Sequence, residues 1–228
     1  MIQRSVDCID CFDGFKSLKD NSFDYVLTSP PYNRKRNDKY ANYDDDVNWY
    51  ELLTKTVENS FRVLKDDGFL LLNIQCNYYN KVDYYSFLGE YARKISQMIV
   101  WEKSNPMPTS GRNITNAYEV ILAMNKHGQS LRGGHTYTKN IFTTKVNSRN
   151  KYSKIHGAVM NEEACDKIFD DFIGENKSVL DPFSGLGTTG VCAIKHHCSF
   201  KGFEIDSQYA ELANERINEC SDMFKTKE

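Results

Sequence analysis

The chain has 228 residues, of which 40% are hydrophobic and 26% charged, and its formal net charge is −2. This composition suffices for one sizeable core, so we expect a single domain. The balanced charge gives no global sign of nucleic-acid binding, and no apolar run of about 18 residues is present to cross a bilayer. The seven cysteines are scattered without zinc spacing. We therefore expect no metal and a cytoplasmic protein with reduced thiols.

Short apolar runs alternate with helical stretches along the chain, which predicts an α/β fold with a mostly parallel sheet. In chain order we expect a strand over 23–27, a helix over 49–64, a strand over 69–74, a helix over 84–95, strands over 98–102 and 120–124, a helix over 165–173, a strand over 178–180, a helix over 188–196, a strand over 199–205 and a helix over 207–218. No internal repeat interrupts this pattern, so one domain is expected over 1–228.

The first predicted strand runs directly into Thr28-Ser29-Pro30-Pro31-Tyr32. The prolines fix φ and remove two N–H donors, so the chain stays extended and offers carbonyl acceptors. An aryl amine is a poor nucleophile because its lone pair is delocalised into the ring. Hydrogen bonds from the amine to the Ser29 hydroxyl oxygen and the Pro30 carbonyl favour the localised form, which attacks an electrophilic methyl. Tyr32 offers a face for stacking an extruded base. The alternative is a rigid turn with Tyr32 in the core.

A second turn, Asp181-Pro182-Phe183-Ser184-Gly185-Leu186-Gly187-Thr188-Thr189, follows a predicted strand and precedes a predicted helix. Its glycines permit backbone approaches that a Cβ would block. Its threonines are expected to cap the helix, whose N-terminus offers free N–H groups. Glu204 ends the next strand, 17 residues after Gly187. A carboxylate there can accept hydrogen bonds from both hydroxyls of a ribose. The pattern indicates a nucleoside-containing cofactor.

The same turn satisfies the G-x-G-x-x-G string of dinucleotide sites, because a third glycine stands at Gly190. Three features disfavour a dinucleotide. Asp-Pro-Phe separates the strand from the glycines, and only 38 residues follow Gly190, too few for a second mononucleotide half. That interpretation also leaves the Pro-Pro-Tyr element unexplained. A purely structural turn is the remaining alternative.

Positive charge is concentrated in one part of the chain. Residues 120–161 contain no acidic residue, and their seven basic residues are Lys126, Arg132, Lys139, Lys145, Arg149, Lys151 and Lys154. A second basic cluster, Arg34-Lys35-Arg36 with Lys39, follows the Pro-Pro-Tyr element. A solvated basic face would explain both clusters, but their position around the expected site favours contacts with phosphates.

These paired motifs resemble the DNA amino-methyltransferases in which the catalytic motif precedes the cofactor motif, the β arrangement. The Pro-Pro-Tyr element matches the family's catalytic motif, and the glycine turn matches its cofactor motif. By resemblance, Asp10 reaches the adenine end of the cofactor, and Glu204 binds its ribose. A middle block beside the base pocket is matched by Trp101, Lys103, Asn105, Pro106, Pro108, Arg112, Asn116 and Glu119. The resemblance covers almost the whole chain.

The resemblance implies a single-domain, Rossmann-like fold with a twisted, mostly parallel sheet, one antiparallel strand pair and helices on both faces. It implies S-adenosylmethionine as methyl donor, S-adenosylhomocysteine as product, double-stranded DNA as substrate and a homodimer. The implied catalytic residues are Ser29, Pro30, Pro31 and Tyr32. The implied cofactor-binding residues are Asp10, Asp181, Phe183, Gly185, Gly187, Thr188 and Glu204. Residues 127–155 form the expected target-recognition segment, and the expected DNA contacts are Arg34, Arg36, Arg112, Arg132, Lys139, Lys145, Arg149 and Lys151.

The sequence departs from the family pattern at His156-Gly157-Ala158-Val159-Met160-Asn161, where the family has His-Pro-Ala and then a second proline, and both prolines are missing. The target base is also open. In the family, serine at the position of Ser29 favours the N4 amine of cytosine, and N6 of adenine is the alternative. An RNA or protein-glutamine methyltransferase and an inactive DNA-binding relative are more distant alternatives.

Overall fold

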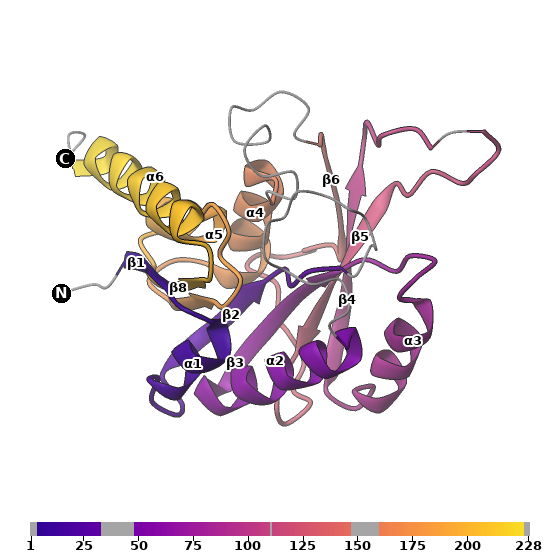
Figure 1. The fold of residues 1–228 in the computed structure, drawn as a ribbon, viewed down its shortest axis with the longest axis horizontal. Coiled ribbons are helices and arrows are strands. Elements are labelled where there is room, and N and C mark those ends of the chain that lie inside the picture. The colour runs from indigo at the N-terminus through magenta and orange to yellow at the C-terminus, as the bar shows by residue number, and fades with distance from the viewer. Residues whose placement is uncertain (1–3, 33–47, 110, 147–159, 226–228) are drawn as a thin grey trace.

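The computed structural model describes residues 4–32, 48–109, 111–146 and 160–225. Their core is an eight-stranded sheet with the strand order β1-β8-β7-β2-β3-β5-β4-β6 (Figure 1). The strands are β1 (Arg4–Cys8), β2 (Phe23–Thr28), β3 (Leu64–Ile74), β4 (Ile95–Lys103), β5 (Tyr118–Met124), β6 (Ile141–Thr144), β7 (Ser178–Asp181) and β8 (Ser199–Glu204). The helices are α1 (Cys11–Lys16), α2 (Trp49–Val63), α3 (Lys81–Glu90), α4 (Glu162–Ile168), a π-helix (Phe169–Ile173), α5 (Thr188–Lys195) and α6 (Ser207–Lys225).

Helices cover both faces of the sheet, as the sequence predicted. In Figure 1, α1, α2 and α3 lie on one face, and α4, α5 and α6 lie on the other. The central strand β3 supplies both layers because successive side chains of a strand point to opposite faces. Phe69 and Leu71 join the core cluster under α4, α5 and α6, whereas Leu70 and Leu72 join the cluster under α1, α2 and α3. The buried apolar run of β3 therefore reflects a strand covered on both sides.

One strand, β5, runs against the direction of the rest. It is antiparallel to β3 and to β4, and the other neighbouring pairs are parallel. The sequence predicted one antiparallel pair, and the sheet contains two, because a reversed strand inside a sheet has two neighbours. β5 thereby starts at the edge where the parallel strands end. Tyr118 and Glu119 lie at that edge for this reason.

Several element boundaries differ from the expected ones. Helix α3 ends at Glu90 rather than 95, and β4 begins at Ile95, because Tyr91 already leaves the helical conformation. Strand β3 begins at Leu64, and residues 65–68 form an irregularity where the register against β2 shifts. The strands β1 and β6 and the short helix α1 were not predicted. β1 and β6 are the two edge strands, which are short and only partly buried, so their apolar signal is weak.

The edge strand β1 is held by α6 as well as by β8. The Asn214 side chain accepts a hydrogen bond from the Val6 amide at 2.9 Å and donates one to the Val6 carbonyl at 2.8 Å. One side chain thus satisfies both backbone groups of a residue in the edge strand. None of the helices that the structure describes combines the length and apolar composition needed to cross a bilayer.

Candidate functional site

The two motifs of the sequence meet at one edge of the sheet. β2 and β7 are parallel neighbours, so the Pro-Pro-Tyr loop and the glycine turn leave the sheet side by side. A direct hydrogen bond joins their starting points, from the Thr28 hydroxyl to the Asp181 carboxylate at 2.8 Å. Residues 153 positions apart in the chain are therefore in contact. This edge, at the carboxyl ends of the parallel strands, is where open α/β sheets bind ligands.

Asp181 connects three parts of this edge. Besides Thr28, its carboxylate accepts hydrogen bonds from the Thr189 hydroxyl at 2.6 Å and the Phe183 amide at 3.1 Å. Only 4% of Asp181 is exposed. Burial raises the pKa of this carboxyl group to about 6, and the bonds from Thr189 and Thr28 act in the opposite direction. In this structure Asp181 holds the two loops together, and a direct contact of its side chain with a cofactor stays a prediction.

The glycine turn has the backbone conformation that its sequence indicates. Gly185 has φ 48° and Gly187 has φ 72°, which is the left-handed region. A Cβ on Gly187 would also lie 2.9 Å from the Cβ of Ala213 in α6. The predicted threonine cap is wrong, because Gly187 is itself the N-cap of α5 and Thr189 donates to Asp181 instead. Gly187 is therefore required both by the turn and by the packing of α6.

Arg216 of α6 supports the turn, and this contact was not predicted from the sequence. Its guanidinium donates hydrogen bonds to the Leu186 carbonyl and to the Thr188 hydroxyl, the latter at 3.4 Å. Glu162 of α4 lies 3.4 Å from the same guanidinium. Arg216 is 6% exposed. Within a long helix with many charged residues, one buried arginine has no motif that would distinguish it.

Glu204 lies opposite the glycine turn with its carboxylate oriented by the backbone. Its two oxygens accept hydrogen bonds from the Gly185 amide at 2.8 Å and the Asp206 amide at 2.9 Å. Burial raises the pKa of Glu204. The Ile9 amide binds the Glu204 carbonyl at 2.9 Å, which brings Asp10 to the same edge. Asp10 caps α1 by accepting hydrogen bonds from the amides of Phe12 and Asp13.

These groups fit the nucleoside cofactor that the sequence predicts. A turn without Cβ atoms on its glycines permits close approach, and a carboxylate fixed by two amides can accept bonds from ribose hydroxyls. Phe183 is partly buried against the core cluster under α1, α2 and α3. The described residues contain no group of His, Cys, Asp and Glu side chains that could hold a metal ion.

The Pro-Pro-Tyr loop is anchored through its last two carbonyls. The Trp49 indole donates to the Pro31 carbonyl at 2.7 Å. The Tyr32 carbonyl accepts hydrogen bonds from the side-chain amides of Asn77 at 3.1 Å and Asn80 at 2.9 Å. The Pro30 carbonyl accepts no hydrogen bond from the residues that the structure describes. The carbonyl predicted to accept from an amine is thus available within this part of the chain, and its neighbours fix the loop.

A polar network, buried at Glu119 and Asn73, lies beside this loop. The Tyr32 hydroxyl lies 2.9 Å from the Ser29 hydroxyl and donates to the Glu119 carboxylate, also at 2.9 Å. The Lys103 ammonium contacts the other oxygen of Glu119 at 2.6 Å, and the Asn73 amide donates to the first at 3.0 Å. The sequence placed Lys103 and Glu119 beside the base pocket by resemblance. The role of Asn73 was not predicted, because it lies inside an apolar strand.

The predicted DNA contacts do not form one surface. Arg112, in the loop between β4 and β5, and Lys145, just after β6, lie at the edge that carries Ser29 and are exposed. Arg132 and Lys139 lie in the connection from β5 to β6, which leaves the sheet where β4 begins. The other four predicted contacts, Arg34, Arg36, Arg149 and Lys151, fall outside the described residues. Only part of segment 127–155 therefore returns to the site edge in the described chain.

The fold and this edge define a Rossmann-like class of methyltransferase, and comparisons with known proteins identify the family. The sequence model of the DNA methylase family, N6_N4_Mtase, matches residues 23–215. The chain is 31% identical over 211 residues to the type II methyltransferase M.MwoI of Methanothermobacter wolfeii, covering 86% of this chain and 31% of that protein. It is 25% identical over 242 residues to M2.MboI of Moraxella bovis, covering 95% and 88%. The chain belongs to the DNA methylase family.

Solved structures show the same fold. The PvuII DNA methyltransferase, described as cytosine-N4-specific, superposes with a TM-score of 0.74 at 15% identity, covering 98% of this chain and 95% of that one. The M1.HpyAVI complex with its cofactor SAM superposes with a TM-score of 0.70 at 25% identity, covering 96% and 100%. The Rossmann-like methyltransferase fold predicted from the sequence is thereby confirmed. The chain spans about a third of M.MwoI but most of M2.MboI.

Proposed function

We propose that this protein transfers a methyl group from S-adenosylmethionine to the exocyclic N4 amine of a cytosine extruded from double-stranded DNA. Family membership supports a DNA amino-methyltransferase that uses this cofactor. Cytosine as the base is our inference from Ser29. The observation that carries the proposal is the Thr28–Asp181 hydrogen bond, which joins the amine-accepting loop to the cofactor turn at one edge of the sheet.

In this proposal the residues of the chain bind the cofactor, orient the target base and accept hydrogen bonds from its amine. The glycine turn and Glu204 hold the nucleoside end of the cofactor, which when bound supplies an electrophilic methyl group on a sulfonium. The Ser29 hydroxyl and the Pro30 carbonyl accept hydrogen bonds from the two N–H groups of the target amine. These bonds localise the lone pair of the amine for in-line attack on the methyl group. Tyr32 stacks against the extruded base. The amine needs no covalent intermediate with the protein.

Mass spectrometry of nucleosides tests the proposal directly. Unmethylated plasmid DNA is incubated with the protein and S-adenosylmethionine and then digested to nucleosides. We expect N4-methylcytosine. N6-methyladenine would keep the chemistry and overturn the base, while methylation of RNA or protein instead of any DNA tried would overturn the DNA substrate. A Gly187→Leu variant is the matched blank, because its side chain would collide with Ala213 and disrupt the cofactor turn.

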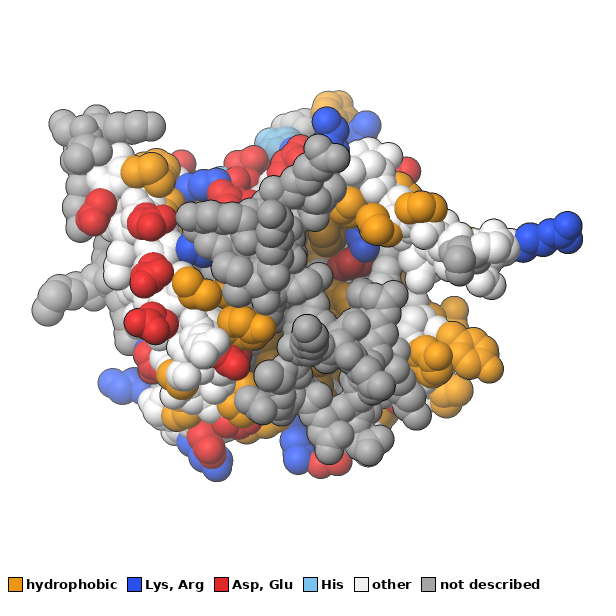
Figure 2. Space-filling view, turned by 45° about the horizontal axis from the view of Figure 1, so that its top comes forward, with side chains coloured by type: hydrophobic (Ala, Val, Ile, Leu, Met, Phe, Trp, Pro, Cys, Tyr) orange, Lys and Arg blue, Asp and Glu red, His pale blue; other side chains and the backbone are white. Residues whose placement is uncertain are grey.

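The distribution of charged side chains around the site edge favours binding of DNA to one side of the molecule. Acidic side chains line α6 on one side, and a basic side chain marks the tip of the projection on the other (Figure 2). The exposed acidic residues of α6 are Glu211, Glu215, Glu219 and Asp222. The loop between β4 and β5, which carries Arg112, projects from the sheet (Figure 1). Duplex phosphates would be repelled from α6 and attracted to the side of Arg112 and Lys145.

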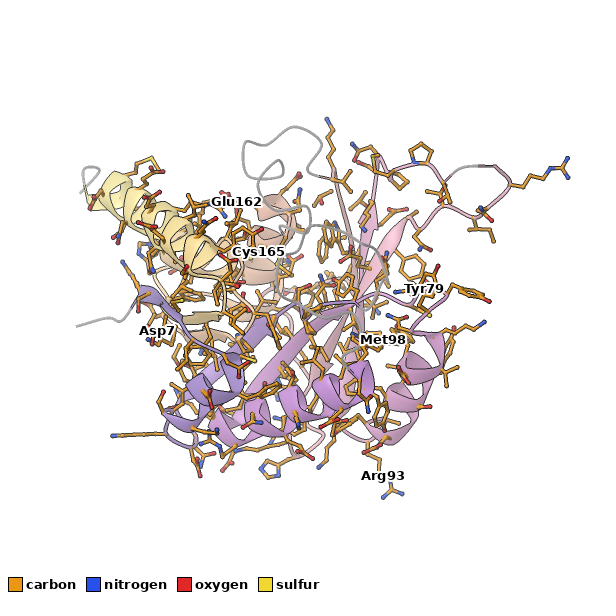
Figure 3. The ribbon with its side chains drawn as sticks, in the orientation of Figure 1. Asp7, Tyr79, Arg93, Met98, Glu162 and Cys165 are labelled. Atoms are coloured by element: carbon orange, nitrogen blue, oxygen red, sulfur yellow. The ribbon has the colours of Figure 1, made fainter. Side chains whose placement is uncertain are left out.

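We expect DNA affinity to fall steeply with salt, because cations bound to phosphate release counterions. Arg112→Ala and Lys145→Ala should each reduce the slope of log affinity against log salt by about one. Arg93 is exposed at the far edge of the sheet, as Figure 3 shows, so Arg93→Ala is the matched control and should leave the slope unchanged. Fluorescence anisotropy with a labelled duplex measures all four proteins. A flat salt response of the wild type would contradict the predicted basic surface.

A further inference from the structure

The hydroxyl of Ser29 can either donate or accept a hydrogen bond, and only one of these suits an amine. An exocyclic amine presents N–H donors, so Ser29 must offer it a lone pair rather than its hydrogen. Other members of the family have an aspartate at this position, and an ionised aspartate would accept a hydrogen bond in every orientation. A serine does so only if its hydrogen is occupied elsewhere. The structure shows what occupies it.

The direction of the network follows from Glu119. This residue is 7% exposed and ion-paired with Lys103 at 2.6 Å, so it is a carboxylate without a hydrogen of its own. The bond between Glu119 and Tyr32 therefore uses the hydrogen of Tyr32. A phenol has one hydrogen, so in the bond between Tyr32 and Ser29 the hydrogen must come from Ser29. Because the hydrogen of Ser29 is used in this bond, the Ser29 oxygen can only accept a hydrogen bond from a substrate.

We propose that Glu119, acting through Tyr32, fixes the Ser29 hydroxyl as an acceptor for the target amine. Glu119 is in this sense a positioning residue that touches neither substrate nor cofactor. The assignment goes beyond stacking as the function of Tyr32, and it rests on the proposed amine-methylating function. Glu119 and Asn73 are buried, and hydrogen bonds in series polarise one another in a buried environment.

The network connects the loop after β2 with three strands of the sheet. Ser29 and Tyr32 follow β2, Asn73 lies in β3, and Glu119 and Lys103 lie on the paired strands β5 and β4. The second hydrogen bond to Glu119, from Asn73, and the ion pair with Lys103 hold the carboxylate on both oxygens. The reversed direction of β5 is what brings Glu119 to this edge, next to the end of β4.

A double-mutant cycle tests the assignment. Tyr32→Phe keeps the aromatic ring and removes the hydroxyl link, and Glu119→Gln keeps the size of the side chain and removes the obligatory acceptor. We expect each single variant to lower kcat about tenfold, with cofactor affinity changed less than about twofold. The double variant should be no slower than Tyr32→Phe alone, because the link that Glu119 acts through is already absent.

Independent losses would overturn the proposal. If Glu119 only supports the fold around Lys103 and Asn73, its replacement lowers activity equally in both backgrounds, and the double variant is about a hundredfold slower. Tyr25→Phe is the matched control, because its hydroxyl binds the Phe172 carbonyl at 3.0 Å away from this network, and its kcat should be unchanged.

The effect of Glu119→Gln in a Ser29→Asp background is a second, independent test. In Ser29→Asp the acceptor does not depend on any partner, so Glu119→Gln should then change kcat less than about twofold. A tenfold loss in that background would overturn the proposal. If the wild type methylates no amine, the proposed function fails and this inference fails with it. If the wild type is active and the losses are independent, the inference alone fails.

Discussion

Replacing Tyr32 by alanine is expected to lower kcat by about 100- to 1000-fold while cofactor affinity changes less than about twofold. Base stacking on an aromatic side chain contributes about 1–3 kcal/mol, and the Ser29 hydroxyl also loses its hydrogen-bond partner. The Tyr32 hydroxyl contacts Ser29 and Glu119, so its loss acts first on the side of the site that accepts the amine. Single-turnover methylation measures the rate, and isothermal titration calorimetry measures cofactor affinity.

Tyr85→Ala is the control for removing an aromatic ring, because Tyr85 is 66% exposed on α3. Its rate and cofactor affinity should match the wild type. A parallel loss of rate and cofactor affinity in Tyr32→Ala would mean that Tyr32 supports the fold rather than the reaction. A lower melting temperature of this variant would point the same way.

Glu204→Ala is expected to weaken cofactor binding about 100-fold. The variant loses the acceptor for the ribose hydroxyls, and hydrogen bonds to a charged group contribute about 1.5–3 kcal/mol each when buried, less when water reaches them. The amides of Gly185 and Asp206 also lose the group that they orient. Calorimetric titration with the cofactor, or with its demethylated product, gives the two affinities.

This variant also carries a pH signature. Burial raises the pKa of Glu204, so the carboxylate takes up a proton at a higher pH than an ordinary glutamate does. Wild-type affinity should therefore fall as pH is lowered toward that raised pKa, and Glu204→Ala should lack this component. Glu211→Ala, an exposed residue of α6, is the matched control and should behave as the wild type. Unchanged affinity in Glu204→Ala would remove the ribose-binding assignment.

The fold class and the two motifs themselves were predictable because they depend on local patterns. Buried strands such as β3 read as continuous apolar runs, and the glycines of the cofactor turn mark a conformation that few other residues adopt. The contact of Thr28 with Asp181 follows once β2 and β7 are neighbours. That neighbourhood is known only from the structure, since the strand order cannot be derived from periodicity.

The supporting residues were not predictable, for a common physical reason. Asn73 sits in an apolar strand and Arg216 in a charged helix, and each acts through partners far away in the chain. A single sequence shows composition and spacing, but not which distant carboxylate or carbonyl a side chain will meet. The choice of cytosine and the homodimer likewise stay predictions.

Asn214, which binds both backbone groups of Val6, draws attention to how α6 joins two parallel strands. β8 leads into α6, and α6 packs on β1, the parallel neighbour of β8. β8, α6 and β1 are arranged as in a β-α-β unit, except that the chain does not continue from α6 into β1. A circular permutation that joined the end of α6 to β1 and placed the new N-terminus before α4 would build the same sheet. In that chain the glycine turn would precede the Pro-Pro-Tyr loop. The fold thus requires that β7 and β2 be neighbours, and it leaves open which of them the chain reaches first.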